Sequence, residues 1–241
     1  MSRRPPGQAS SRGTPGAPAI SPKRAARLKA KKHREAERLF LAEGETLIQE
    51  SKEEPKRLFD KPGEVRRLST LKTPTGPVGV FPFVDVSAGA LLSTTGRVVL
   101  LHGVQDPGNV GTTIRSAHAF GAGVALSRGC ADLYNPKTVR ATMGSIFHAP
   151  VGRELDSMEF LREARRAGFR SIAAILGSGE SPRSLPGGRL LIVVGAEGAG
   201  LPEEIAEASE VRTTIPSKAA SLNAATAASI LLYEAYMRVL P

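Results

Sequence analysis

Short apolar runs separated by helical stretches are the feature that most constrains this 241-residue chain. From Arg97 onward, five such runs stand out: VVLLH, GVALS, SIAAIL, LLIVVG and VRTTIP. Helical patterns cover about residues 110–121, 135–144, 157–167 and 221–239. Continuous apolar strands that alternate with helices indicate a parallel sheet covered by helices on both faces. The predicted fold class is therefore α/β.

The chain before this region divides into two parts. Residues 1–22 are rich in Pro, Gly, Ser and Ala without periodicity, so we expect a disordered basic tail over residues 1–36, although a helix-prone stretch begins at Ser21. Residues 37–90 form a small α/β subdomain, in which RLFLAEGETLIQE predicts a strand followed by a helix and GPVGVFPFV predicts further strand. The linker to the main domain, residues 97–241, is expected near SAGALLSTTG.

Positive charge is concentrated at the N-terminus. Residues 1–38 contain eleven Lys or Arg and two Glu, which gives +9 of the net charge of +10. Such an arm suits a polyanion such as RNA or DNA, and a solubilising tail is the open alternative. The single cysteine, Cys130, excludes a disulfide scaffold and fits a reducing compartment. With no signal peptide or membrane span evident, we expect a cytoplasmic protein without membrane contact.

The loop GAEGAGLP, which begins at Gly195, follows a buried strand, where α/β proteins bind ligands. Its glycine spacing fits neither a P-loop nor a dinucleotide fingerprint, and Glu197 inside it would repel a phosphate. The ligand is therefore expected to be something other than a nucleotide phosphate.

Two further loops follow strands in the same way. In LHGVQDPGNVGTTIRSAHAFGAG, Asn109 can cap a helix, and Arg115 lies inside that helix among small and apolar residues. An arginine in that setting needs an anion, for which Glu197 is a candidate. In TIPSKAASLNAATAASILLYEAYMR, Ser221 is the expected helix cap, and Asn223 beside it is available to a ligand.

Together, PGNVGTTIRSAHAFGA, IVVGAEGAGL and IPSKAASLNAATAASILLYE resemble the three signature motifs of the SpoU (TrmH-like) family of RNA 2′-O-ribose methyltransferases, within the SPOUT superfamily. The resemblance covers about residues 97–241. A weaker resemblance involves RLFLAEGETLIQE and LSTLKTPTGPVGVF. These segments resemble the beginning and the end of the ribosomal-protein-L30e-like substrate-binding domain that many members of the family have. The middle of that domain is largely missing here, so the subdomain is expected to be a shortened form.

The resemblance implies methyl transfer from S-adenosylmethionine to a ribose 2′-hydroxyl, with ribosomal RNA as the expected substrate. It also implies a SPOUT domain with a deep C-terminal trefoil knot, and a homodimer. Five residues are expected to bind the cofactor: Gly195, Gly200, Ile215, Leu222 and Leu176. The catalytic set is Arg115, Asn109, Glu197, Ser221 and Asn223, in which Arg115 grips the phosphate beside the target ribose and stabilises the developing alkoxide.

No metal is expected, because the reaction needs none and the four histidines, His33, His102, His118 and His148, are scattered along the chain. Two alternatives stay open at this stage. One is a transfer-RNA 2′-O-methyltransferase. The other is a non-catalytic RNA-binding or ribosome-assembly protein on the same fold. The basic arm over residues 21–38 is expected to make phosphate contacts that compensate for the shortened subdomain.

Overall fold

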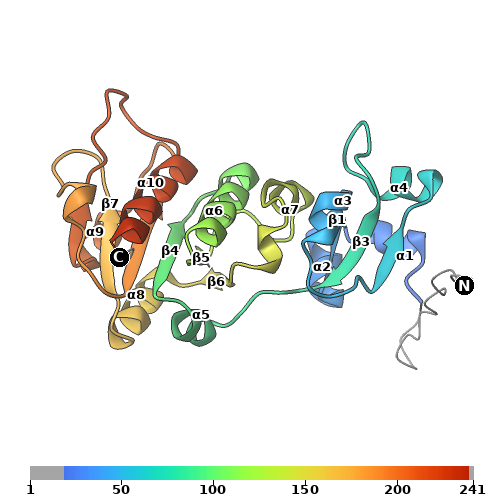
Figure 1. Ribbon diagram of the computed structural model, residues 1–241, viewed down its shortest axis with the longest axis horizontal. Helices are drawn as coiled ribbons and strands as arrows, with labels where there is room; N and C mark the ends of the chain where they lie inside the picture. Colours follow the sequence, from blue (N-terminus) through green and yellow to red (C-terminus); the bar gives the residue numbers. More distant parts are fainter. Residues whose placement is uncertain (1–18, 239–241) are drawn as a thin grey trace, which may run out of the picture.

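The computed structural model describes residues 19–238, and its larger part is built on one six-stranded sheet (Figure 1). Every pairing in this sheet is parallel, and the strand order is β6-β5-β4-β8-β7-β9. The strands are β4 (Arg97–His102), β5 (Gly123–Ser127), β6 (Val151–Leu155), β7 (Arg170–Ala174), β8 (Leu190–Gly195) and β9 (Val211–Thr213). The predicted α/β class and parallel sheet are confirmed.

The central strands β4 and β8 are apolar and buried, except for Arg97 and His102 at the two ends of β4, because helices cover both faces of the sheet. Alternate side chains of β4 enter separate cores: Val99 and Leu101 pack on one side, Val98 and Leu100 on the other. The first core includes residues of α6 (Pro107–Ala119), α7 (Pro136–Ala141) and α10 (Ala224–Met237). The second includes residues of α5 (Ala88–Thr94), α8 (Ser157–Arg166) and α9 (Glu203–Ala208).

Several elements of the larger domain are absent from the predicted set. The edge strand β6 has the mixed sequence VGREL, in which only the first two residues are buried, so no apolar run marks it. The expected linker SAGALLSTTG instead contains α5, whose Leu91 and Leu92 are buried in the second core. The short helix α9 and the 3-10 turns η1 (Ser145–Phe147) and η2 (Pro182–Ser184) complete this part of the chain.

The N-terminal subdomain is a three-stranded antiparallel sheet of order β1-β3-β2 with helices around it. The expected strand and helix of RLFLAEGETLIQE are β1 (Leu39–Glu43) and α3 (Glu45–Gln49), and β3 (Val78–Pro82) lies in the second predicted segment. Between them come β2 (Arg57–Phe59) and α4 (Pro62–Leu68). One face of the sheet packs on the helices, whereas Phe40 and Phe81 on the other face join the core of the larger domain, where both rings contact Phe147.

The expected tail ends earlier than residue 36. Residues 1–18 lie outside the described part, but α1 (Pro22–Arg27) and α2 (Lys31–Glu37) are folded against the subdomain. Ala25 and Leu28 are buried in its core, and Arg34 is only 3% exposed. Disorder is therefore the wrong expectation for residues 22–36, because the apolar side chains between the charges have a core to enter.

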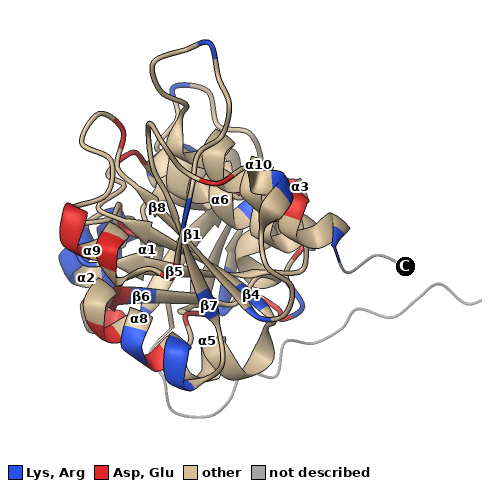
Figure 2. Ribbon diagram, turned by 90° about the vertical axis from the view of Figure 1, so that its left-hand side faces the viewer, with Lys and Arg blue, Asp and Glu red and all other residues tan. Residues whose placement is uncertain are grey.

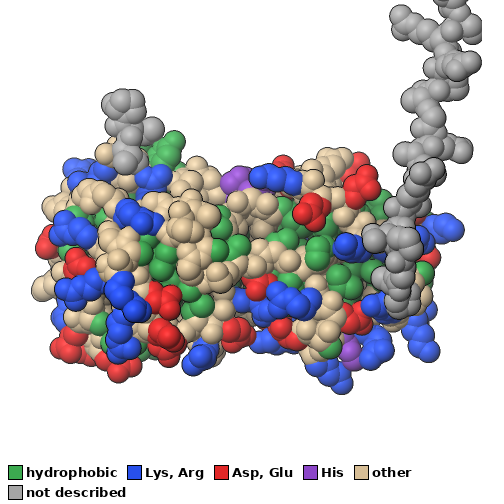
Figure 3. Space-filling model, turned by 90° about the horizontal axis from the view of Figure 1, so that it is seen from below, with side chains coloured by type: hydrophobic (Ala, Val, Ile, Leu, Met, Phe, Trp, Pro, Cys, Tyr) green, Lys and Arg blue, Asp and Glu red, His purple; other side chains and the backbone are tan. Residues whose placement is uncertain are grey.

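Within residues 19–238, no helix is long and apolar enough to cross a membrane. On the face shown in Figure 3, Lys and Arg side chains are interspersed with Asp and Glu.

Candidate active site

The first predicted motif forms the turn from β4 into α6. Asp106, not Asn109, is the N-cap: its Oδ1 accepts the backbone N–H of Asn109 at 2.9 Å. A hydrogen bond from Lys137, with the backbone N–H of Asn109, lowers the pKa of Asp106 and keeps the capping carboxylate charged. Because Pro107 can occupy the first helical position, the helix begins two residues before Asn109. The side chain of Asn109 therefore takes no part in capping the helix.

The second motif, after β8, folds back on itself. A Cβ on Gly195 would lie 2.2 Å from the backbone carbon and oxygen of Gly200, so only glycine fits there. Ala196 and Gly200 form an isolated bridge, and Gly198 and Gly200 have φ values of +81° and +67°. The glycines serve a close approach of the backbone to itself, and the loop presents Glu197 at its exposed tip.

The third motif leads from β9 into α10, and its cap also differs from the expected one. Asn223 caps the helix, and its Oδ1 accepts the backbone N–H groups of Ala225 at 2.9 Å and Thr226 at 3.1 Å. Ser221 is exposed two residues earlier. Because the Oδ1 of Asn223 is taken by the helix, its Nδ2 must face outward from the cap.

That outward amide joins the three motifs. The Nδ2 of Asn223 donates to Oδ1 of Asn109 at 2.8 Å and to Oε1 of Glu197 at 2.5 Å. The Nδ2 of Asn109 donates to the same Glu197 oxygen at 2.6 Å. The three side chains form a closed triangle, which we call the polar triangle. Hydrogen bonds to a carboxylate are shorter and stronger than neutral ones, so the loop after β8 is fixed against both helices.

Arg115 is not the partner of Glu197. It lies six residues beyond Asn109, about 9 Å along the helix at 1.5 Å per residue. Its side chain is exposed, and it has no hydrogen bond or ion pair within the part of the chain that the structure describes. The expectation of an internal anion for Arg115 is therefore wrong for a single protomer. The small residues of α6 are instead explained by packing: a Cβ on Gly111 would lie 2.4 Å from Cβ of Ala141 in α7.

The loops after β7, β8 and β9 leave the carboxyl ends of neighbouring strands (Figures 1 and 2). Residues of these loops line a cleft of about 960 Å³. Its lining includes all five residues expected to bind the cofactor: Leu176, Gly195, Gly200, Ile215 and Leu222. Glu197 and Ser221 line it as well. The residues expected on the cofactor and part of the catalytic set are thus brought to one place.

The lining also contains residues that the sequence analysis missed, among them Gly177, Ser178 and Ser217. Gly177 and Ser178 follow β7, and the rule that ligands bind beyond the carboxyl ends of parallel strands could have found them. A second cleft of about 530 Å³ lies across the loop after β8, with Ala196, Glu197, Ala199 and Gly200 lining both clefts. Asn109 and His102 line this second cleft. The Glu197 carboxylate therefore borders both spaces.

Other titratable groups are engaged elsewhere. His102 Nδ1 lies 2.8 Å from Ser157 Oγ, and the rings of His118 and His148 stack with centroids 4.5 Å apart. Burial raises the pKa of the Cys130 thiol, which keeps it protonated and unreactive. Among residues 19–238, no three His, Cys, Asp or Glu side chains are grouped as a metal site would require.

Comparison with known proteins extends these observations. The model of the SpoU rRNA Methylase family matches residues 96–233. The "23S rRNA (guanosine(2553)-2'-O)-methyltransferase RlmP" of Bacillus subtilis is 33% identical over 233 residues, covering 86% of this chain and 92% of that protein.

Two solved structures match both parts of the chain. The AdoMet-bound rRNA methyltransferase from Sinorhizobium meliloti has a TM-score of 0.81 at 30% identity, covering 91% of this chain and 95% of that one. The SpoU methyltransferase AviRb from Streptomyces viridochromogenes, in complex with AdoMet, has a TM-score of 0.77 at 26% identity, covering 90% of this chain and 97% of that one.

Proposed function

This chain belongs to the SpoU rRNA methylase family, and from that premise we propose that it transfers a methyl group from S-adenosylmethionine to a ribose 2′-hydroxyl of ribosomal RNA, most specifically 23S rRNA. The match to RlmP extends over 86% of the chain and so includes most of the N-terminal subdomain. Since that subdomain is the expected substrate-binding part, similarity there supports the same class of RNA.

The large cleft suits the cofactor in size and in charge. Its volume of about 960 Å³ lies within the usual range for small-molecule sites. S-adenosylmethionine supplies an electrophilic methyl group on a positively charged sulfonium, and Glu197 borders the cleft with a negative charge. Gly195, Ile215 and Leu222 would bind it through backbone groups, with Leu176 and Gly200 completing the walls. The negative charge of Glu197 would repel the phosphates of a dinucleotide, so binding of a dinucleotide in this cleft is disfavoured.

Arg115 is the residue that we expect to contact the RNA substrate. A guanidinium stays charged at any physiological pH, so it does not serve as a neutral base. Its exposure and its lack of a partner within residues 19–238 leave it able to bind the phosphate next to the target ribose. There it would stabilise negative charge on the attacking oxygen as the proton leaves. The polar triangle would orient the nucleotide, with Ser221 beside it.

Methyl transfer needs alignment more than acid–base strength. Holding the hydroxyl oxygen in line with the methyl carbon can contribute about 7 to 11 kcal/mol to lowering the barrier. The polar triangle is suited to that task, because its short hydrogen bonds hold the start of α6, the loop after β8 and the start of α10 in fixed positions relative to one another. Asn109 and Glu197 line the second cleft, where the ribose would lie.

We also propose a homodimer, in which the partner completes the surroundings of Arg115. The exposed residues of α6 and α10 support this: Thr112, Arg115 and Ala119 on one helix, Tyr233 and Met237 on the other. The two helices pack on each other, partly through Ser116 and Ser229, whose Oγ atoms are 2.7 Å apart. Light scattering of the purified protein at micromolar concentration tests this; a monomeric mass that persists with donor and RNA would refute it.

A deep trefoil knot and a cytoplasmic location remain parts of the same proposal. The path from the edge strand β9 back to α10, which packs against the central strand β8 and α6, is compatible with a knot. Ribosomal RNA as substrate favours the cytoplasm.

The observation that carries the proposed function is the meeting of Asn109, Glu197 and Asn223 beside a cleft lined by all five expected cofactor residues. The test is to incubate the protein with labelled S-adenosylmethionine and 23S rRNA, and to map 2′-O-methylated riboses. Transfer to one ribose supports the proposal. Transfer to tRNA alone would correct the substrate, and cofactor binding with no transfer to either RNA would favour a non-catalytic RNA-binding protein.

A further inference from the structure

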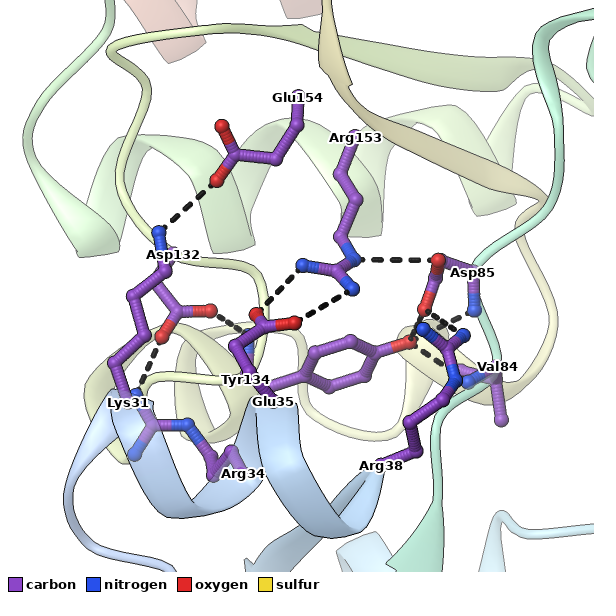
Figure 4. A network of polar contacts seen from close by, with 10 residues as sticks. All are labelled: Lys31, Arg34, Glu35, Arg38, Val84, Asp85, Asp132, Tyr134, Arg153 and Glu154. Atoms are coloured by element: carbon purple, nitrogen blue, oxygen red, sulfur yellow. Dashed lines mark hydrogen bonds and ion pairs between the residues drawn. The ribbon is translucent and has the colours of Figure 1, made fainter.

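The helix α2, which the sequence presents as part of a basic arm for RNA, is occupied by contacts inside the protein (Figure 4). Lys31 pairs with Glu154 at 3.0 Å, and Arg34 donates to Asp132 and to the backbone oxygens of Leu28 and Lys29. Glu154 and Asp132 belong to the larger domain. The expected phosphate contacts of α2 are therefore largely replaced by contacts between the two parts of the chain.

Arg153 of β6 lies at the centre of these contacts. Its Nη1 and Nη2 donate to the two carboxylate oxygens of Glu35 in α2 at 2.7 and 3.2 Å, and its Nε lies 3.2 Å from Oδ2 of Asp85. The guanidinium also lies over the rings of Phe83 and Tyr134, 4.9 and 5.5 Å from their centroids. One side chain therefore links the N-terminal subdomain, the connecting segment and the larger domain.

The connecting segment is fixed independently by Tyr134. Its hydroxyl donates to Oδ1 of Asp85 at 2.6 Å and accepts the backbone N–H groups of Val84 and Asp85 at 2.7 and 2.8 Å. Burial raises the pKa of Tyr134, so the phenol keeps its proton and remains a donor. The Tyr134 ring stacks on Phe83 with centroids 3.8 Å apart. A flexible tether would show none of these contacts.

We define the interdomain clamp as the eight charged residues of this network together with Tyr134: Lys31, Arg34, Glu35, Arg38, Asp85, Asp132, Arg153 and Glu154. Four are positive and four negative, so the clamp carries no net charge to offer a phosphate. Arg38 and Glu154 have φ values of +49° and +55°, a conformation that costs free energy in residues other than glycine. Both of these strained residues form ion pairs in the clamp, Arg38 with Asp85 at 3.5 Å.

Apolar packing also holds the two parts together, since Phe40 and Phe81 enter the common core. A half-buried ionic network adds little net stability, because desolvation offsets the attraction. What such a network can add is a single relative orientation, because the bidentate pair of Arg153 and Glu35 forms both of its hydrogen bonds only in one geometry. The clamp is therefore better suited to setting geometry than to supplying stability.

On the basis of the proposed function, we propose that Arg153 is a positioning residue: through the clamp it fixes the N-terminal subdomain relative to the methyl-transfer site and so determines which ribose of the bound RNA reaches that site. The subdomain and the larger domain then act as one rigid template. RNA phosphates are met by cations outside the clamp, such as the exposed Lys52, Lys56 and Lys72.

The first test measures geometry and needs no activity. In a Cys130→Ser background, Arg66→Cys in α4 and Glu207→Cys in α9 carry spin labels, one on each side of the clamp. The labelled protein is mixed with an excess of unlabelled protein, so that dimers with two labelled protomers are rare and the measured distance lies within one protomer. We expect one narrow distance distribution for the parent and a clearly broader or shifted one for Arg153→Met. The control is Arg128→Met, which removes an exposed arginine that lies 3.8 Å from Asp156 outside the clamp. A broad parent distribution, or identical distributions in parent and Arg153→Met, would overturn the proposal.

The second test measures methyl transfer to 23S rRNA fragments. For Arg153→Met we expect KM for RNA to rise at least tenfold and secondary methylated riboses to appear, while affinity for S-adenosylmethionine stays within twofold. Glu35→Gln is a milder change and should also raise KM for RNA and produce secondary methylated riboses. It serves as the test variant if Arg153→Met does not fold. An unchanged KM with one methylated ribose in both variants would refute the role of the clamp. Absence of transfer by the parent would instead refute the proposed function and leave the distance measurement valid.

Discussion

Asn223 donates from Nδ2 to Oδ1 of Asn109 over 2.8 Å, although 114 positions separate the two residues in the sequence. Both amides also donate to one oxygen of Glu197. The orientation of Asn223 follows from its capping role, because its Oδ1 accepts two backbone N–H groups of α10 and leaves only Nδ2 for the site. Helix capping and site assembly thus depend on the same side chain.

Asn223→Asp separates those two roles. Aspartate caps a helix as well as asparagine does, so we expect the thermal stability of the protein to change little. The variant loses both donors and places a second carboxylate beside Glu197, so methyl transfer should fall by about 100-fold, the usual cost of misplacing a reacting group by about 1 Å. Single-turnover assays measure this. Adding Glu197→Gln should recover part of the loss, and a fully active single variant would contradict the role given to the polar triangle.

Arg115→Ala tests the proposed phosphate contact. We expect methyl transfer to be abolished while affinity for S-adenosylmethionine, measured by calorimetry, stays within a few-fold, because Arg115 does not line the cofactor cleft. Arg115→Lys keeps the charge but not the planar fork and should recover only part of the activity. Full activity of Arg115→Ala would remove this residue from the mechanism.

Gly195→Ala tests the folded-back loop. The added methyl group would overlap the backbone of Gly200, which has no flexible end to move aside. We expect about 1 to 3 kcal/mol of destabilisation in chemical unfolding, the range for overpacking, together with a loss of cofactor binding. Gly187→Ala is the matched control, since nothing lies within 4 Å of its added Cβ. Equal stability and equal cofactor affinity in the two variants would contradict this account of the loop.

Stability should depend on pH through His118. Partial desolvation of its ring, followed by the neighbouring charge of His148, lowers the pKa of His118, although the residue is exposed, so the folded protein favours the neutral ring. The unfolded chain takes up the proton first as the pH falls. The contribution of His118 to stability is therefore present above its unfolded pKa of about 6.5 and is lost as the pH falls through the folded value. Urea unfolding at pH 8 and pH 5 should show a smaller loss for His118→Gln than for the parent.

Removing residues 1–18 tests whether the part of the basic arm that precedes α1 binds RNA. These residues carry Arg3, Arg4 and Arg12. If these three cations contact RNA phosphates, the slope of log K against log salt should decrease by about 2 for single-stranded RNA. An unchanged slope would show that they do not. Removal of residues 1–36 is a poorer experiment, because it also deletes α1 and most of α2 and should lower the thermal stability of the subdomain.

Much of the fold is readable from the sequence because the evidence for it is local. The runs VVLL and LLIVVG have no polar side chain, as expected for strands covered on both faces, and they form most of the paired central strands β4 and β8. Gly195 is expected to bind the cofactor, and the structure adds that its missing Cβ lets the loop fold back on the backbone of Gly200. VGREL could not be recognised, because an edge strand buries one end of its length and has no distinct pattern.

The sequence by itself determined the parallel sheet, the three loops after its strands and the residue types that those loops carry, because burial and turn geometry act over a few neighbouring positions. Only the tertiary structure decided which side chain meets which. Glu197 pairs with two asparagines and leaves Arg115 exposed, and two cations of α2, Lys31 and Arg34, pair with carboxylates of the larger domain. Charged residues in a sequence show that ion-pair or hydrogen-bond partners are needed. Their partners are chosen by packing between segments that can lie more than 100 residues apart.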